Sequence, residues 1–121
     1  YSAGTHNQDI RFVRPVFYNG GLVAITMSLC HWTDVGGPMP GSFNPKATEC
    51  FAEGIQLPAM KIYENDEPVR HTFDLIKLNM RVPHDRMGDI AAQYQAVRQM
   101  ERRVCEYVDR YGLDTILQSF E

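Results

Sequence analysis

The 121-residue sequence lacks a long apolar run, a CxxC pair and an excess of basic residues. Without a stretch of about 20 apolar residues, no membrane-spanning helix is expected, and nothing at the start resembles a signal peptide. The three cysteines, Cys30, Cys50 and Cys105, are an odd number at wide spacing, which favours reduced thiols in a cytoplasmic protein. The formal net charge of -3 predicts no general attraction to nucleic acid or to acidic membranes.

The residues that are present have an ordinary globular composition, with 44% hydrophobic and 22% charged residues. The chain begins at Tyr1 without a methionine and runs directly into expected structure. We therefore expect residues 1–121 to form a single partial domain, a fragment of a larger domain in a longer protein.

A β-hairpin is the first expected element. Residues 10–18 and 22–29 are rich in β-branched, aromatic and other apolar side chains, and Asn19-Gly20-Gly21 between them has the residue types of a tight turn. Pro15 has no N–H for a ladder bond, which indicates an edge strand or a bulge.

The middle of the chain is expected to be less regular. Residues 35–45 contain three glycines and three prolines and predict an ordered loop. Residues 47–52 predict a short helix, residues 55–63 a strand broken by Pro58, and residues 64–68 a polar turn.

Helices are expected in the last part of the chain. Apolar side chains recur at helical spacing over residues 72–80 and over a long amphipathic stretch, residues 85–111, which Gly112 should end. A further short helix is expected over residues 113–120. With residues 1–63 mostly strands and loops and residues 70–121 mostly helical, the predicted fold class is α+β.

Two His/Asp pairs flank the expected hairpin. His6 and Asp9 precede the first strand, and His31 and Asp34 follow the second. A turn centred on Asn19-Gly20 places Gln8 opposite His31, and a slip of one residue places Ile10 there. Since cross-strand neighbours have Cβ atoms about 4.5–5.5 Å apart, either register brings His31 close to Asp9.

Two imidazoles and one carboxylate at one end of a hairpin are a ligand set that Zn²⁺, Mn²⁺ or Fe²⁺ accepts. Asp34 is expected to be a further ligand or a partner that orients an imidazole. The competing interpretation is structural, because a single HxxD motif usually caps a turn through its aspartate.

Other candidates have simpler explanations. His84, beside Asp85, fits a helix start, and His71 fits an exposed position. Cys30 fits a buried thiol better than a nucleophile. The glycines near Gly36 match no phosphate-binding fingerprint.

The order of motifs resembles the hydantoinase B/oxoprolinase family. The matching segments are Gly4-Thr5-His6-Asn7-Gln8-Asp9, Arg14-Pro15-Val16-Phe17, His31-Trp32-Thr33-Asp34-Val35-Gly36-Gly37, Pro40-Gly41-Ser42, Glu53-Gly54-Ile55-Gln56-Leu57-Pro58, Lys61-Ile62-Tyr63, Gly88-Asp89-Ile90-Ala91-Ala92-Gln93 and Arg110-Tyr111-Gly112-Leu113-Asp114. The resemblance covers essentially the whole chain, and family members are much longer.

The resemblance implies an internal portion of a B-type subunit, or of the equivalent half of a fused oxoprolinase. It implies His6, Asp9 and His31 as metal ligands, with a further acidic ligand upstream of this chain. We assign His31 and Asp34 to the catalytic machinery, with Asp34 supporting the metal ligands without binding the metal itself. The implied cofactors are a divalent metal (Mn, Zn or Fe) and ATP, the latter bound by an A-type partner subunit that phosphorylates the substrate.

The predicted function is therefore part of an ATP-dependent hydantoinase or oxoprolinase that opens a cyclic amide within a hetero-oligomer. One alternative is a subunit of a related ketone carboxylase. Another, of a different class, is an assembly scaffold whose His/Asp cluster is only a hydrogen-bonded core. We expect the fragment alone to be inactive.

Overall fold

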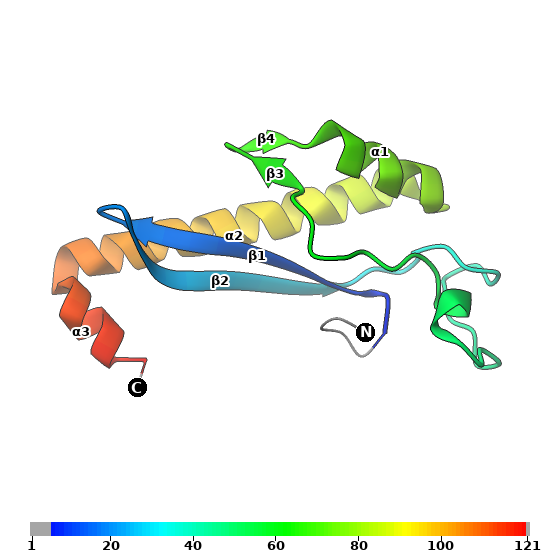
Figure 1. The fold of residues 1–121 in the computed structure, drawn as a ribbon, viewed down its shortest axis with the longest axis horizontal. Helices are drawn as coiled ribbons and strands as arrows, with labels where there is room; N and C mark the ends of the chain where they lie inside the picture. Colours follow the sequence, from blue (N-terminus) through cyan, green and yellow to red (C-terminus); the bar gives the residue numbers. More distant parts are fainter. Residues whose placement is uncertain (1–5, 121) are drawn as a thin grey trace. The chain divides into compact units, whose positions relative to one another are not determined.

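The computed structural model describes residues 6–120, which form two antiparallel hairpins and three α-helices (Figure 1). In chain order the elements are β1 (Asp9–Tyr18), β2 (Gly21–His31), the 3-10 helix η1 (Cys50–Glu53), β3 (Tyr63–Glu64), β4 (Glu67–Pro68), α1 (Arg70–Asn79), α2 (Pro83–Tyr111) and α3 (Leu113–Gln118). β1 pairs with β2, and β3 pairs with β4. The predicted α+β class, with a hairpin before a long helix, is confirmed.

The turns form where the sequence predicts them. Asn19 and Gly20 have φ values of 49° and 82°, the pair of positive angles that a two-residue hairpin turn of type I′ requires. Asn65 and Asp66 have φ values of 51° and 65° and connect β3 to β4 in the same way. Asparagine, aspartate and glycine tolerate these angles better than other residues, so the turns are local properties of the sequence.

The predicted helices are also present, with small shifts at their ends. α1 begins at Arg70, two residues earlier than expected, and α2 begins at Pro83, whose fixed φ suits the first helical position. Gly112 ends α2 with a φ of 84°, and its N–H donates to the carbonyl of Val108 at 2.9 Å.

Two local predictions for the middle of the chain are wrong. Residues 55–62 form no strand, and only Tyr63 of the expected segment belongs to one. Pro58 removes a ladder donor there, and the N–H of Ile55 bonds to Val35 in a loop instead of a strand. The expected helix over residues 47–52 is a shorter 3-10 helix, η1.

The described chain comprises two compact units. One contains residues 11–29 of the β1–β2 hairpin and residues 91–120 of the helical region. In it, one hairpin face lies along α2, with Phe12, Val16 and Val97 buried. The buried hydroxyl of Thr26 lies 3.3 Å from the carbonyl of Val97, and Arg14 pairs with Glu101 at 2.5 Å. The opposite hairpin face leaves alternate apolar side chains exposed.

The second unit contains, of the described residues, 6–10 and 30–90. Its core consists of Trp32, Val35, Ile76, Met80 and Ile90, each at most 5% exposed. Trp32 and Val35 come from the loop after β2, Ile76 from α1, Met80 from the residue directly after α1, and Ile90 from the first part of α2. This unit contains all four residues of the predicted site.

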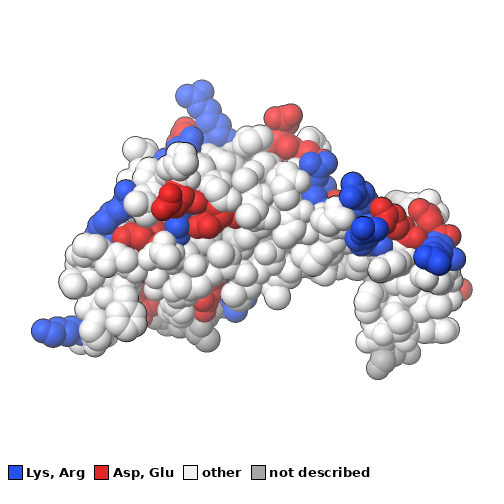
Figure 2. Space-filling view, turned by 180° about the vertical axis from the view of Figure 1, so that it is seen from behind, with Lys and Arg blue, Asp and Glu red and all other residues white. Residues whose placement is uncertain are grey.

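Among the described residues, no helix combines the length and apolar character needed to cross a bilayer. Figure 2 shows acidic and basic side chains interspersed on the face drawn, without a broad field of one sign. This distribution agrees with the small net charge of -3.

Candidate metal centre

His6, Asp9 and His31 lie together in the structure. Nε2 of His6 is 3.4 Å from Oδ2 of Asp9, and Nδ1 of His31 is 3.2 Å from Oδ1 of Asp9. The centroids of the two imidazole rings are 4.8 Å apart. The predicted proximity of His31 to Asp9 and His6 is therefore confirmed.

Backbone pairing at the open end of the hairpin produces this arrangement. Asp9 begins β1 and His31 ends β2. The N–H of Trp32 donates to the carbonyl of Gln8 at 2.9 Å, which holds the two strand ends together just beyond Asp9 and His31. The N–H of Asp9 donates to the carbonyl of His6 at 3.2 Å, a turn that directs His6 back toward the strand end.

The three side chains fit a divalent metal by their chemistry. One ligand atom from each residue lies within 4.8 Å of the others. Ligands bound at about 2.0–2.2 Å to one ion lie roughly 3–3.5 Å from one another. Both His–Asp distances are of this size but end on different oxygens of Asp9, and the whole set spans up to 4.8 Å. Two imidazoles and a carboxylate suit Zn²⁺, Mn²⁺ or Fe²⁺ better than Ca²⁺ or Mg²⁺, which prefer oxygen ligands.

Solvent reaches the cluster from the histidine side. The side chains of His6 and His31 are 36% and 53% exposed, whereas that of Asp9 is 16% exposed. Within the described chain, the imidazoles are therefore the more open side of the cluster.

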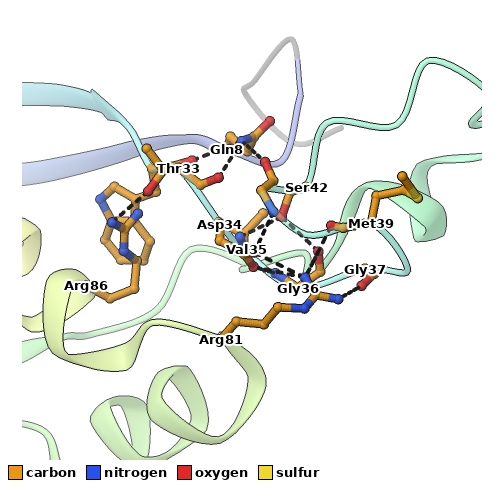
Figure 3. A network of polar contacts seen from close by, with 12 residues as sticks. Gln8, Thr33, Asp34, Val35, Gly36, Gly37, Met39, Ser42, Arg81 and Arg86 are labelled. Carbon is orange, nitrogen blue, oxygen red and sulfur yellow. Dashed lines mark hydrogen bonds and ion pairs between the residues drawn. The ribbon is translucent and has the colours of Figure 1, made fainter.

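Asp34 lies in a different environment from these three residues. Its side chain is 7% exposed, and its carboxylate accepts the N–H groups of Gly36 at 2.9 Å and Gly41 at 2.7 Å. Nη1 of Arg81 lies 3.2 Å from both carboxylate oxygens (Figure 3). These contacts join Asp34 to the glycine-containing loop. The role expected from the sequence, a further ligand or a partner that orients an imidazole, stays a prediction.

The pKa of Asp34 reflects two opposing effects. Burial by itself raises the pKa of this carboxyl group, but the N–H groups of Gly36 and Gly41 and the guanidinium of Arg81 favour the charged form. The second effect is larger, and the pKa is lowered from the ordinary value of 3.8. Asp34 is therefore a charged structural centre for the loop at neutral pH.

The same loop is held by two more side chains. Besides Asp34, Arg81 donates to the carbonyls of Gly36, Gly37 and Met39. The hydroxyl of Ser42 donates to the carbonyl of Gly36 at 2.8 Å and accepts the N–H of Val35 at 2.7 Å. Figure 3 shows these groups directed toward one another around the loop.

This network predicts a pH dependence for the stability of the loop. Because the folded pKa of Asp34 is below the unfolded one, its ionised form contributes stability above about pH 4, and that contribution is lost as the pH falls through the folded pKa. Asp34→Asn should therefore destabilise the full-length protein at pH 7, with a deficit that shrinks below about pH 4. Urea unfolding at several pH values measures this, and a pH-independent deficit would contradict it.

The other sequence candidates lie apart from the cluster. His71 is exposed, and the side chain of His84 is fully exposed, 3.9 Å from Asp85. Cys30 is a half-buried free thiol. Gly4 and Thr5, which begin the first family motif, lie outside the described residues.

Several residues of the site were not singled out from the sequence. They are Gln8, Ser42, Arg81 and Arg86, of which Gln8 and Ser42 lie inside the quoted motifs. The Arg86 side chain is 4% exposed, and its Nη2 donates to the Thr33 hydroxyl at 3.0 Å and pairs with Asp89 at 2.9 Å. Its guanidinium carbon lies 5.9 Å from the centre of the Trp32 ring. Thr33 and Trp32 are more than 50 residues from Arg86 in sequence, so spacing alone could not reveal these two contacts.

Known proteins with similar sequences cover the whole chain. The beta subunit of the Pseudomonas jessenii caprolactamase is 40% identical over 113 residues, which are 93% of this chain and 19% of that protein. A putative D-/L-hydantoinase B-type subunit from Pseudomonas sp. (strain NS671) is 35% identical over 122 residues, 100% of this chain and 21% of that protein. The chain thus spans about a fifth of the length of these relatives.

A solved structure shows the same fold. The crystal structure of the ATP-dependent caprolactamase from Pseudomonas jessenii matches with a TM-score of 0.88 and 39% identity, over 95% of this chain and 20% of that chain. The family model for hydantoinase B/oxoprolinase matches residues 1–121. With this match over its full length, the chain belongs to the hydantoinase B/oxoprolinase family.

Proposed function

We propose that the protein containing this chain is the B-type part of an ATP-dependent hydrolase that opens a cyclic amide. The observation that carries this proposal is the His6–Asp9–His31 cluster, which lies at the open end of the β1–β2 hairpin in a hydantoinase B/oxoprolinase chain. The names of the relatives support the substrate class, because caprolactam, hydantoin and 5-oxoproline all contain a cyclic amide.

His6, Asp9 and His31 would hold the metal ion, with Mn, Zn and Fe as the candidates. When bound, such an ion supplies Lewis acidity for polarising a carbonyl oxygen or for lowering the pKa of water. Asp9 contacts both imidazoles and sets their separation. Asp34 supports the site indirectly by fixing the loop that follows β2.

ATP would bind to an A-type partner in a hetero-oligomer. One relative is described as an ATP-dependent caprolactamase, and the caprolactamase and hydantoinase relatives are each named as one subunit of an enzyme. The partner would transfer the terminal phosphoryl group of ATP to the amide oxygen, which makes the amide carbon more electrophilic. Water would then add at this carbon, the C–N bond would break with the ring nitrogen leaving as an amine, and a second water would hydrolyse the resulting acyl phosphate to release phosphate. The free thiols Cys30, Cys50 and Cys105 fit a cytoplasmic enzyme.

A second candidate function is a subunit of an ATP-dependent ketone carboxylase. The acetophenone carboxylase delta subunit of Aromatoleum aromaticum is 35% identical over 120 residues, 97% of this chain. The His/Asp cluster suits either reaction, because both require polarisation of a carbonyl oxygen.

A steady-state assay of the full-length protein with its A-type partner and ATP tests this choice. We expect ATP-dependent hydrolysis of hydantoin, 5-oxoproline or caprolactam, and no bicarbonate fixation with acetone or acetophenone. Dialysis against a chelator should abolish ring opening, and one of Mn²⁺, Zn²⁺ or Fe²⁺ should restore it. Carboxylation without hydrolysis would select the second function, whereas no turnover together with no bound metal would favour the scaffold.

A further inference from the structure

We infer that Gln8 is a positioning residue for the metal ligands, because its amide joins the segment carrying His6 and Asp9 to the segment that follows His31. The inference rests on the proposed metal site and adds a residue to it. Gln8 lies between two of the ligands in sequence, yet it is 7% exposed while both of those ligands are partly open to solvent.

The Gln8 amide bonds to three carbonyl oxygens of the facing segment. Its Nε2 lies 3.1 Å from the carbonyl of Trp32, 3.3 Å from that of Thr33 and 3.1 Å from that of Gly41 (Figure 3). An amide nitrogen has two hydrogens, so one of them is shared between two acceptors. The side chain therefore joins the residues directly after His31 to the loop that Asp34 stabilises.

The backbone of Gln8 strengthens the same connection. Its carbonyl accepts the N–H of Trp32 at 2.9 Å and the N–H of Ile10 at 3.0 Å. Main chain and side chain together thus fix residues 32 and 33 against residue 8. Because His31 and Asp9 are the immediate neighbours of these bonded residues, their separation depends on Gln8.

Arg86 holds the same segment through different groups. It donates to the hydroxyl of Thr33 and lies over the ring of Trp32. Gln8 binds the carbonyls of these two residues, and Arg86 contacts their side chains. The segment after His31 is therefore restrained by two buried side chains, those of Gln8 and Arg86.

Glutamine suits this position because it is neutral and donates through the atom that faces the carbonyls. A glutamate has nearly the same shape but only accepts hydrogen bonds when ionised. Gln8→Glu would place a carboxylate against three carbonyl oxygens and remove every side-chain bond to the segment. Gln8→Met keeps the length of the side chain and removes the bonds without adding charge.

The experiment measures Co²⁺ binding by the full-length protein, prepared without metal. Four forms are compared, namely the wild type, Gln8→Glu, Gln8→Met and the matched control Gln56→Glu. Gln56 is exposed, is not a member of the cluster, and its side-chain amide bonds to the thiol of Cys50. Mutation of a residue that orients metal ligands typically lowers metal affinity by about 10–100-fold. We expect a loss of this size for Gln8→Glu, a smaller loss for Gln8→Met, and wild-type affinity for Gln56→Glu. The visible absorption of bound Co²⁺ should also change in the Gln8 variants, which reports altered ligand geometry, while circular dichroism checks the fold.

Each outcome has a defined meaning. Wild-type Co²⁺ affinity and absorption in both Gln8 variants would overturn the inference, while the metal site would stand if His6→Ala/His31→Ala still lost Co²⁺. If His6→Ala/His31→Ala bound Co²⁺ as tightly as the wild type, the proposed metal site would be overturned, and this inference with it. If Gln8→Glu fails to fold, Gln8→Met decides: weaker binding supports the inference, and unchanged binding refutes it.

Discussion

Replacing His6 and His31 together by alanine should remove the bound metal and reduce ring opening by about 1000-fold or more. The double substitution removes two of the three ligands that this chain supplies and leaves Asp9 with the acidic ligand expected upstream. Two carboxylates are fewer than the three protein ligands of a usual catalytic transition-metal site. Lewis-acid catalysis supplies several kcal/mol of transition-state stabilisation, and each 1.4 kcal/mol corresponds to about tenfold in rate. The rate should therefore fall by at least about three orders of magnitude.

Two measurements on the full-length protein with its partner check this result. Plasma mass spectrometry should find near-stoichiometric Mn, Zn or Fe in the wild type and none in the double variant. Coupled turnover should disappear in His31→Ala as well, while ATP hydrolysis by the partner should persist in part, because that step takes place on another subunit.

His84→Ala is the matched control, since His84 is fully exposed and outside the cluster. It should retain both metal and activity. Full coupled activity in His31→Ala would rule out the metal mechanism. An active, metal-free wild type would assign acid–base or structural roles to His6, Asp9 and His31.

Gly54→Ala should destabilise the unit that contains residues 30–90 by about 3 kcal/mol, a large effect for the addition of one methyl group. Gly54 has a φ of 111°, and a Cβ atom there would lie 2.4 Å from the carbonyl oxygen of Val35. The same oxygen accepts the N–H of Ile55 at 2.8 Å. Relief of the clash would therefore require backbone movement and loss of this hydrogen bond.

Gly41→Ala provides a control in the same unit. Gly41 also has a positive φ, 80°, but a Cβ atom there would approach no closer than 3.9 Å to a neighbour. Its free energy of unfolding should fall by only about 1–2 kcal/mol, the cost of a left-handed backbone conformation at a residue with a side chain. Chemical denaturation of the full-length variants, with hydrogen exchange followed over residues 30–56, measures the difference. Equal effects of the two substitutions would show that the contact with Val35 is not tight.

The fold could be predicted best where short-range chemistry determines it. The Asn19-Gly20 turn, the apolar strands beside it and the long amphipathic helix ended by Gly112 all depend on residues close together in sequence. The same hairpin brings His31 to Asp9, so the candidate ligand cluster followed from turn geometry and strand pairing. The strand expected over residues 55–63 failed because local apolar content cannot supply a partner strand.

The sequence by itself determined the hairpin, the helices, the family and the convergence of His6, Asp9 and His31. Only the tertiary structure decided that Asp34 bonds to Arg81 and the loop, and that Gln8 holds the segment after His31. The physical reason is sequence separation: Asp34 and Arg81 are 47 residues apart, and Gln8 and Trp32 are 24 apart. Turns and helices are specified by neighbouring residues, whereas buried polar groups acquire their partners only when distant segments pack together.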